Sequence, residues 1–236
     1  MINFFRKKRK KMAGDNKALK YTRYAIGEIV LVVIGILIAL QINTWNEDRK
    51  RENLANAYIE KLINDLALDT INMNNLLIKG QKNIKTADDY FNYFNEGTHS
   101  LDALIDSSLN IRIHFVRYLP VDYTFNDMQS SGNIDLLNEK QRRALMELSN
   151  EQEFTQIIIE KVISSIIQET HEYEKYLNST FHTKISIQQD EKLKIQGLLH
   201  KNNAISWGRA LSENAEWRIG VMKEKTKEII KLLQEN

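Results

Sequence analysis

An acidic residue lies inside the most apolar segment of the chain. Residues 25–42 are apolar except for Glu28 and Gln41. A carboxylate in such a segment could pair with a polar or basic group of another helix, or relay a proton. Glu28, Gly35 and Ala39 follow one another at spacings of seven and four residues, which places them on one helical face. We call these three residues the transmembrane stripe, because Gly35 and Ala39 are small enough to let a second helix approach closely.

Glu28 also has a simpler interpretation. It is four residues from Tyr24, so on a helix it would lie about 6 Å below the membrane surface. At that depth its side chain could extend to the headgroups beside Arg23 and Lys20. A helix–helix contact and an acid that only reaches the surface are both open interpretations.

Two pairs of residues have the spacing of metal ligands on a helix. His171 and Glu174 could begin a metal site, but the Glu-x-x-His pairs of di-metal helical bundles are absent, because Gln168 occupies the position where a Glu would be needed. Asp65 and Asp69 could bind calcium, but no loop with calcium-ligand spacing surrounds them. We therefore expect no metal site, and we predict that Asp65 and Asp69 lie on a water-exposed helix face.

The sequence contains no pattern typical of an enzyme. Ser130-Ser131-Gly132 could form a nucleophile turn, but no histidine is near in sequence. Phosphate-binding glycine loops and nucleotide motifs are absent from the sequence. Aromatic residues could line a small-ligand pocket or simply fill a core: Tyr173, Tyr176, Trp207, Trp217 and the cluster 90–94. We expect no catalytic residue, no cofactor and no enzymatic activity.

The apolar segment predicts one transmembrane helix over residues 24–45. A helix of this length spans roughly 32 Å, which matches the hydrocarbon core of a bilayer. Tyr24 and Trp45 flank it as interfacial anchors. A cleaved signal peptide is the alternative, but no small-x-small cleavage site follows the apolar run. No later segment is long and apolar enough to span.

Basic residues precede the predicted span. Residues 1–23 contain nine Lys or Arg and one acid. Six are consecutive: Arg6, Lys7, Lys8, Arg9, Lys10 and Lys11. The positive-inside rule places this leader in the cytoplasm and residues 46–236 on the other side. The leader could also bind anionic membrane lipids, or serve only as the topology signal. The remaining chain is mildly acidic, which argues against a nucleic-acid partner.

The rest of the chain predicts an all-α fold, in which a single N-terminal transmembrane helix continues into an up-and-down helical bundle. Pro120 is the only proline and glycines number nine. We expect a helix from residue 46 to Gly80, a second helix over 82–95 and an extended connector over 111–120. A long helix should follow, opened by a capping box of Asn138 and Gln141. An irregular segment over 183–204 should then lead to a final helix. The predicted domains are the basic leader (1–23), the transmembrane helix (24–45) and the helical-bundle domain (46–236).

Two segments resemble a known family. "YAIGEIVLVVIGILIALQINTWNE" is similar to the start of a domain-of-unknown-function family of single-pass membrane proteins common in Bacteroidetes, and "TFNDMQSSGN" resembles that family's Phe-Asn-x-x-x-Ser-Ser-Gly-Asn segment. The resemblance implies a bacterial inner-membrane protein with a periplasmic helical domain, and it implies no activity.

These observations favour an interaction or scaffold protein that assembles through its transmembrane helix and its outward bundle. Its partner would be a second copy of the chain or another membrane protein. The alternative is a periplasmic ligand-sensing module that acts through a partner, and a periplasmic enzyme is the third hypothesis.

Overall fold

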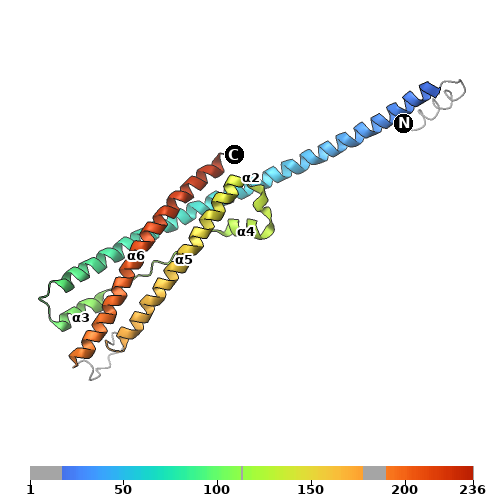
Figure 1. Ribbon diagram of the computed structural model, residues 1–236. Coiled ribbons are helices and arrows are strands. Elements are labelled where there is room, and N and C mark those ends of the chain that lie inside the picture. The colour runs from blue at the N-terminus through green and yellow to red at the C-terminus, as the bar shows by residue number, and fades with distance from the viewer. Residues whose placement is uncertain (1–17, 113, 178–189, 236) are drawn as a thin grey trace. The chain divides into compact units, whose positions relative to one another are not determined.

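The computed structural model describes residues 18–112, 114–177 and 190–235. It contains the helices α2 (Ala18–Asn95), α3 (Leu101–Asn110), α4 (Tyr123–Ser131), α5 (Glu139–Glu174) and α6 (Glu191–Gln234), with a short 3-10 helix η1 (Asn133–Leu136) (Figure 1). No strand occurs in these residues. The predicted all-α class with a long N-terminal helix is confirmed.

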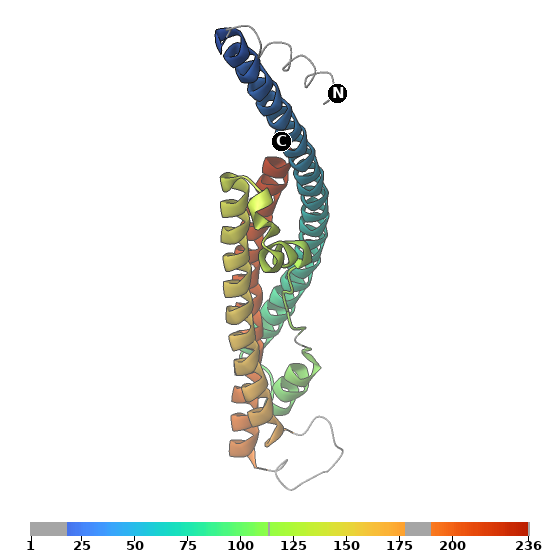
Figure 2. The ribbon, with the colours of Figure 1, turned by 90° about the vertical axis from the view of Figure 1, so that its right-hand side faces the viewer.

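The chain divides into two compact units, residues 1–56 and 57–236. The described part of the first unit is helical, and it includes the apolar segment. The second unit is a bundle of the 57–95 part of α2 with α5 and α6, to which α3 and α4 are added (Figure 2).

Helix α6 runs antiparallel to the other two long helices of the bundle. Tyr90 of α2 bonds to Asn202 of α6, and Gln81 bonds to Glu216, so residue numbers rise along one helix as they fall along the other. The pairs of α5 with α6 follow the same order: Glu147 with Lys225, and Glu169 with His200.

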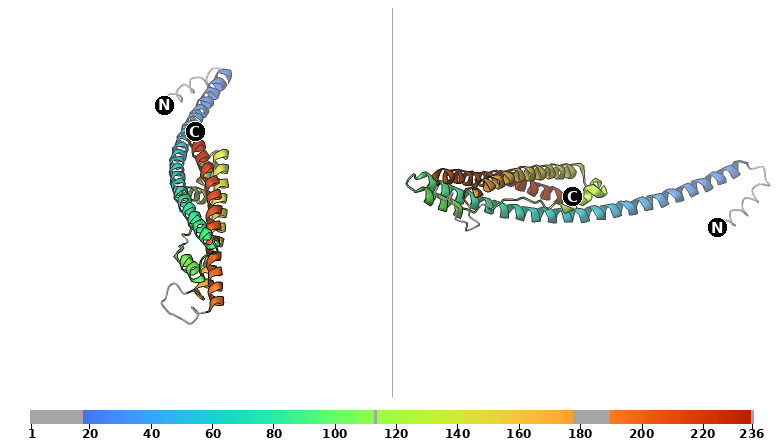
Figure 3. Two further views of the ribbon diagram at one scale, coloured as in Figure 1. Left: turned by 90° about the vertical axis from the view of Figure 1, so that its left-hand side faces the viewer. Right: turned by 90° about the horizontal axis from the view of Figure 1, so that it is seen from below.

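Helix α2 runs parallel to α5 within the bundle. Leu62 and Leu145 line the same small cavity, and Asp69 bonds to Gln152, so numbers rise together. The predicted alternation therefore holds for α5 and α6, whereas the return from α2 to α5 runs through the described residues 111–112 and 114–122, which form no helix (Figure 3). This confirms the extended connector, which is anchored by alternate buried side chains, Val116 and Tyr118.

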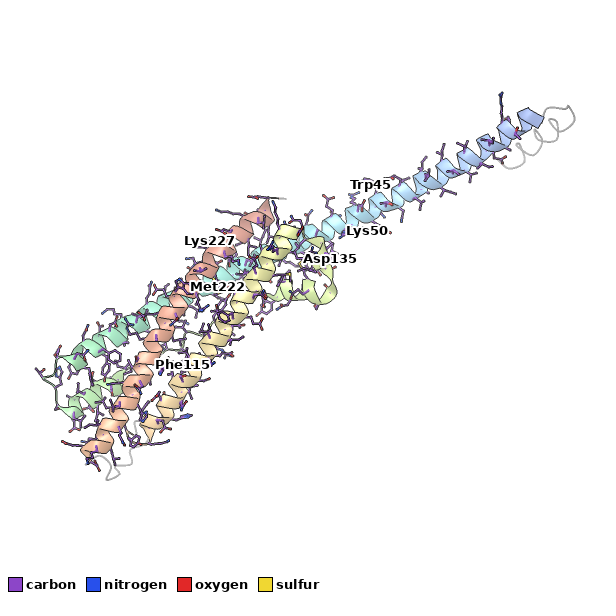
Figure 4. The ribbon with its side chains drawn as sticks, in the orientation of Figure 1. Trp45, Lys50, Phe115, Asp135, Met222 and Lys227 are labelled. Atoms are coloured by element: carbon purple, nitrogen blue, oxygen red, sulfur yellow. The ribbon has the colours of Figure 1, made fainter. Side chains whose placement is uncertain are left out.

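The bundle core consists of the inward residues of the three long helices and of the connector. The largest fully buried side chains are Tyr118, Leu62, Met73, Met128, Leu148, Ile159, Ile166, Ile205, Leu211, Ile219, Met222 and Leu233. Met222 lies between α5 and α6, where Thr155 Oγ1 donates to its sulfur at 3.7 Å (Figure 4).

Two predicted interruptions are wrong. Helix α2 does not end at Gly80: this glycine is buried within the helix, and a Cβ there would lie at an ordinary contact distance, 3.6 Å, from the backbone oxygen of Ser212 on α6. Residues 191–204 are not irregular but form the first turns of α6, opened by Asp190, whose side chain accepts from the backbone N–H of Lys192. In the sequence this part of α6 looks polar, partly because Lys201 occupies an inward position where an apolar residue would be expected. Its Nζ lies 4.7 Å from the centre of the Tyr173 ring. Residues 183–189 lie outside the described residues.

The predicted capping box at the start of α5 is confirmed. Asn138 Oδ1 accepts from the backbone N–H of Gln141 at 3.0 Å, and Gln141 Oε1 accepts from the backbone N–H of Asn138 at 3.2 Å. We expect Asn138→Ala to lower the free energy of unfolding by about 1 kcal/mol, because one helix-end N–H loses its acceptor. Urea unfolding of the full chain in mild detergent measures the change. Asn138→Asp, which keeps the acceptor, should stay within about 0.5 kcal/mol of the unmodified chain.

Candidate functional site

The first candidate site is the apolar segment of α2. This helix is long and apolar enough to cross a membrane, and no residue of its most apolar part is buried in the structure. Gly35 and Ala39 are exposed, Glu28 is half-buried, and a Cβ added at Gly35 would meet nothing within 4 Å. The surface around Gly35 is therefore open to a second helix. The predicted anchors Tyr24 and Trp45 are also exposed, and Figure 4 labels Trp45 on α2.

The basic leader cannot be described in the same way. Its six consecutive basic residues, Arg6, Lys7, Lys8, Arg9, Lys10 and Lys11, lie outside the described residues. The prediction that they contact membrane lipids therefore stays a prediction.

The second candidate site is a buried polar centre beneath the connector. Asp69 of α2 is fully buried, with an exposed fraction of 0%. Tyr118 Oη donates to Asp69 Oδ2 at 2.7 Å, Gln152 Nε2 donates to the same oxygen at 3.0 Å, and the backbone N–H of Val121 donates to Oδ1 at 3.2 Å. The predicted water-exposed face is wrong for Asp69, because the connector covers it, whereas Asp65 is half-buried and bonds to Thr124 in the first turn of α4.

The polar centre changes the acidity of its own members. Burial raises the pKa of Asp69, the three hydrogen bonds partly oppose this, and the nearby Asp122 raises the pKa further. Burial and the Asp69 carboxyl also raise the pKa of the Tyr118 hydroxyl. Tyr118 therefore stays protonated and can donate to Asp69, so the centre holds the connector between α2 and α5.

The Phe-Asn-x-x-x-Ser-Ser-Gly-Asn segment extends this attachment. The backbone N–H of Thr124 donates to Asp65 Oδ2 at 2.8 Å, and Tyr58 Oη donates to Asp127 Oδ2 at 2.9 Å. Asn133 Nδ2 in turn donates to Tyr58 Oη at 2.9 Å. The segment thus docks α4 and η1 on α2, and Gly132 ends α4 with a φ of +75°, which suits glycine.

The two serines of this segment have structural partners. Ser130 Oγ and Ser131 Oγ both donate to the backbone oxygen of Asp127, at 3.1 and 2.7 Å. These bonds belong to the last turn of α4, as expected of serines near a helix end. They give the pair a local role in ending the helix.

The space beside the polar centre is too small for a substrate. A cavity of about 20 Å³ lies between α2, the connector and α5, lined by Asp65, Val121, Asp122 and Gln152 with apolar neighbours. Such a volume holds about one water molecule. The centre is therefore suited to holding elements together.

The two pairs with metal-ligand spacing, His171 with Glu174 and Asp65 with Asp69, are not brought together with further ligands among the described residues. No group of three His, Asp or Glu residues that could hold a metal occurs among the residues the structure describes. His200 of α6 instead bonds to Glu169 of α5 at 2.7 Å. This pair joins two helices, and it could not be found from spacing along one helix.

The aromatic residues divide between the core and the surface. Tyr90 and Tyr173 are buried, whereas Trp207 is 45% exposed and Trp217 is 66% exposed. The two tryptophans therefore do not fill the core. Arg218 lies over Trp217, 5.4 Å from its ring centre.

Sequence reasoning missed three residues of the polar centre and its extension, Tyr58, Tyr118 and Gln152. Gln152 had a signal, because it falls between Leu148 and Thr155 in the inward spacing of α5, where an uncharged polar residue needs a partner. Tyr118 also had one, because it alternates with buried Val116. Tyr58 had none that distinguished it from an ordinary core tyrosine.

The comparisons with known proteins give one match. A family model described as "Family of unknown function (DUF6090)" matches residues 28–196, a range that contains the transmembrane stripe and the polar centre. No curated protein and no solved structure matches the chain.

Proposed function

Because the chain belongs to the DUF6090 family, whose function is unknown, we propose from its own residues that it is a membrane-anchored helical interaction protein. It assembles with a second copy or another membrane protein, and its bundle presents surfaces to partners. The proposal assigns no reaction to the chain.

One observation carries this proposal: the apolar segment of α2 is exposed on all sides. Large apolar side chains such as Ile29, Leu31 and Leu37 have more than half of their surface exposed. A helix that is apolar all round is stable in a bilayer or against another apolar helix, and not in water. The apolar segment therefore supports a protein that acts at a membrane, to which this helix anchors it.

The proposed location is the bacterial inner membrane, with the leader in the cytoplasm and residues 46–236 in the periplasm. The excess of basic residues before the span supports this orientation. We expect the chain to stay in the membrane pellet after alkaline carbonate washing. Protease added to spheroplasts should degrade the bundle, and added to inverted vesicles should remove only the leader. The opposite pattern would reverse the proposed orientation.

The transmembrane stripe is the proposed contact within the membrane. Gly35→Leu fills the open surface beside Ala39, so we expect the assembled fraction of the full chain in mild detergent to fall severalfold. Glu28→Gln tests whether the acid takes part, and we expect a smaller fall. The control is Val33→Leu, which places the same leucine side chain on the opposite face and should leave assembly unchanged. Equal assembly in all three variants would contradict a contact through this stripe.

A ligand-sensing module is a second candidate, favoured by one cavity. A space of about 380 Å³ lies beside α3 and the start of α6, lined by Asp102, Asp106, Lys194 and Tyr176 with apolar residues between them. This volume falls within the range of small-molecule sites. A screen of amines and amino acids for a rise in the unfolding temperature tests this candidate. A true ligand should lose its effect in Asp106→Ala.

A further inference from the structure

One face of α2 in the bundle carries no charge. Between Lys61 and Lys79, every exposed residue of this helix is uncharged: Asn64, Ala67, Leu68, Ile71, Asn72, Asn75 and Ile78. Charged residues form 27% of the chain, and the outer face of a surface helix normally carries many of them. Depletion of charge together with exposed apolar residues is the composition of the centre of a protein interface.

Five of these residues have the spacing of a helix-pairing seam. Asn64, Leu68, Ile71, Asn75 and Ile78 are separated by four, three, four and three residues, and we call them the uncharged face. This alternation is the a/d repeat of a coiled coil. The side chains of Leu68, Ile71 and Ile78 are 54%, 55% and 66% exposed, so the bundle itself does not cover them.

The asparagines of this face favour an identical partner. Neither Asn64 nor Asn75 makes a side-chain hydrogen bond to any residue that the structure describes. An amide donates and accepts, so it is complementary to a copy of itself. A single asparagine in an apolar seam is also the type of residue that sets the register of paired helices.

The direction of pairing follows from the residues at the ends of the face. In a parallel pair in register, each asparagine meets its own copy, as do Leu68, Ile71 and Ile78. An antiparallel pair that matched Asn64 with Asn75 would place Ile78 opposite Lys61. In the parallel pair Lys61, three residues before Asn64 in the same repeat, meets its own copy at the end of the seam, with the exposed Glu60 of the other chain beside it.

We propose that the uncharged face of α2 binds a second copy of this chain, in parallel and in register. This deepens the proposed function, because it rests on the chain assembling with itself, and it places a contact outside the membrane segment. The proposed contact extends over residues 64–78, which span about 21 Å of helix.

Cysteine cross-linking tests the register directly. The natural chain has no cysteine, so a single introduced thiol reports one contact. Full-length Ile78→Cys in its membrane, treated with copper phenanthroline, should become mostly covalent dimer, because the two copies of residue 78 meet only in a parallel pair. Ile157→Cys on α5, whose native side chain is 54% exposed, is the matched control and should stay monomeric.

The possible failures can be told apart. Cross-linking of Leu68→Cys without Ile78→Cys would overturn the parallel register. An oligomer by light scattering in mild detergent, with Ile78→Cys no more cross-linked than Ile157→Cys, would overturn the uncharged face alone. A monomer in both membrane cross-linking and light scattering would overturn self-assembly, and this face with it.

A second variant tests the contact without cysteine chemistry. Ile71→Lys places a charge at the middle of the uncharged face, and its exposure means that the bundle should keep its helical content by circular dichroism. We expect the oligomeric fraction in mild detergent to fall severalfold. An unchanged fraction in a correctly folded variant would overturn the proposal.

Discussion

Replacing Gly197 by alanine is expected to lower the free energy of unfolding by about 2 kcal/mol, although alanine normally stabilises a helix. Gly197 lies in α6 and is buried. A Cβ added there would lie 2.5 Å from Leu177 Cγ and 2.8 Å from Tyr176 Cβ. Tyr176 Cβ is attached directly to the backbone, so it cannot move aside as the end of a long side chain would. The helix must therefore shift away from the end of α5.

The same substitution at Gly220 is the matched control. Gly220 lies in the same helix, and a Cβ there would meet nothing within 4 Å. Gly220→Ala should therefore raise the free energy of unfolding by about 0.5–1 kcal/mol, through helix propensity alone. Urea unfolding of the full chain in mild detergent, followed by circular dichroism, compares the two. If both variants were stabilised, the close approach at Gly197 would be refuted.

Replacing Asp69 by alanine should have the largest effect in the bundle, a loss of about 3–5 kcal/mol. The substitution removes the acceptor of three hydrogen bonds and leaves the buried Tyr118 hydroxyl and Gln152 amide without it. The same unfolding measurement gives the change. Asp89→Ala on the same helix is the control: Asp89 is exposed and pairs only with Lys85 four residues earlier, so its loss should cost less than about 1 kcal/mol. Equal losses would show that the polar centre does not hold the connector.

The pH dependence of stability should identify the Asp69 carboxyl specifically. Its pKa is raised above the ordinary value of 3.8, so the folded state holds the proton more tightly than the unfolded state. Its contribution is therefore greatest below that value and is lost as the pH rises through the folded pKa. Asp69→Asn keeps the shape and should cost about 1–2 kcal/mol. The difference in unfolding free energy between the natural chain and this variant should shrink from pH 4 to pH 7, and a growing difference would contradict a raised pKa.

The helices that follow a regular apolar period were predictable. The inward spacing of α5 and the capping box at Asn138 depend only on neighbours within one or two turns, and both are present as expected. The connector was also predictable, since alternation of side chains and a proline are local properties. The confirmed parts are those in which nearby residues decide the conformation.

The parts that were mispredicted depend on distant residues. Asp69 was assigned to the surface by its charge, although it lies between Leu66 and Met73 in the inward spacing of α2; its partners Tyr118 and Gln152 come 49 and 83 residues later. Gly80 looks like a helix breaker, but it is buried inside α2 where this helix packs on Ser212 of α6. The start of α6 was mispredicted as an irregular polar segment partly because of Lys201. A single buried lysine cannot be distinguished from a solvated one in the sequence.

The pairing of α2 with α6 has a consequence for biosynthesis. Asn83 and Tyr90 reach their partners Ser212 and Asn202 only when the ribosome has made more than a hundred further residues. Until then the apolar inner face of α2 is not covered by α6. Helices α5 and α6, in contrast, can pair through contacts between residues that are closer in sequence. The first helix of the bundle therefore cannot complete its packing until the last helix has been synthesised. A nascent chain that stalls before α6 would present an incomplete core to chaperones and proteases.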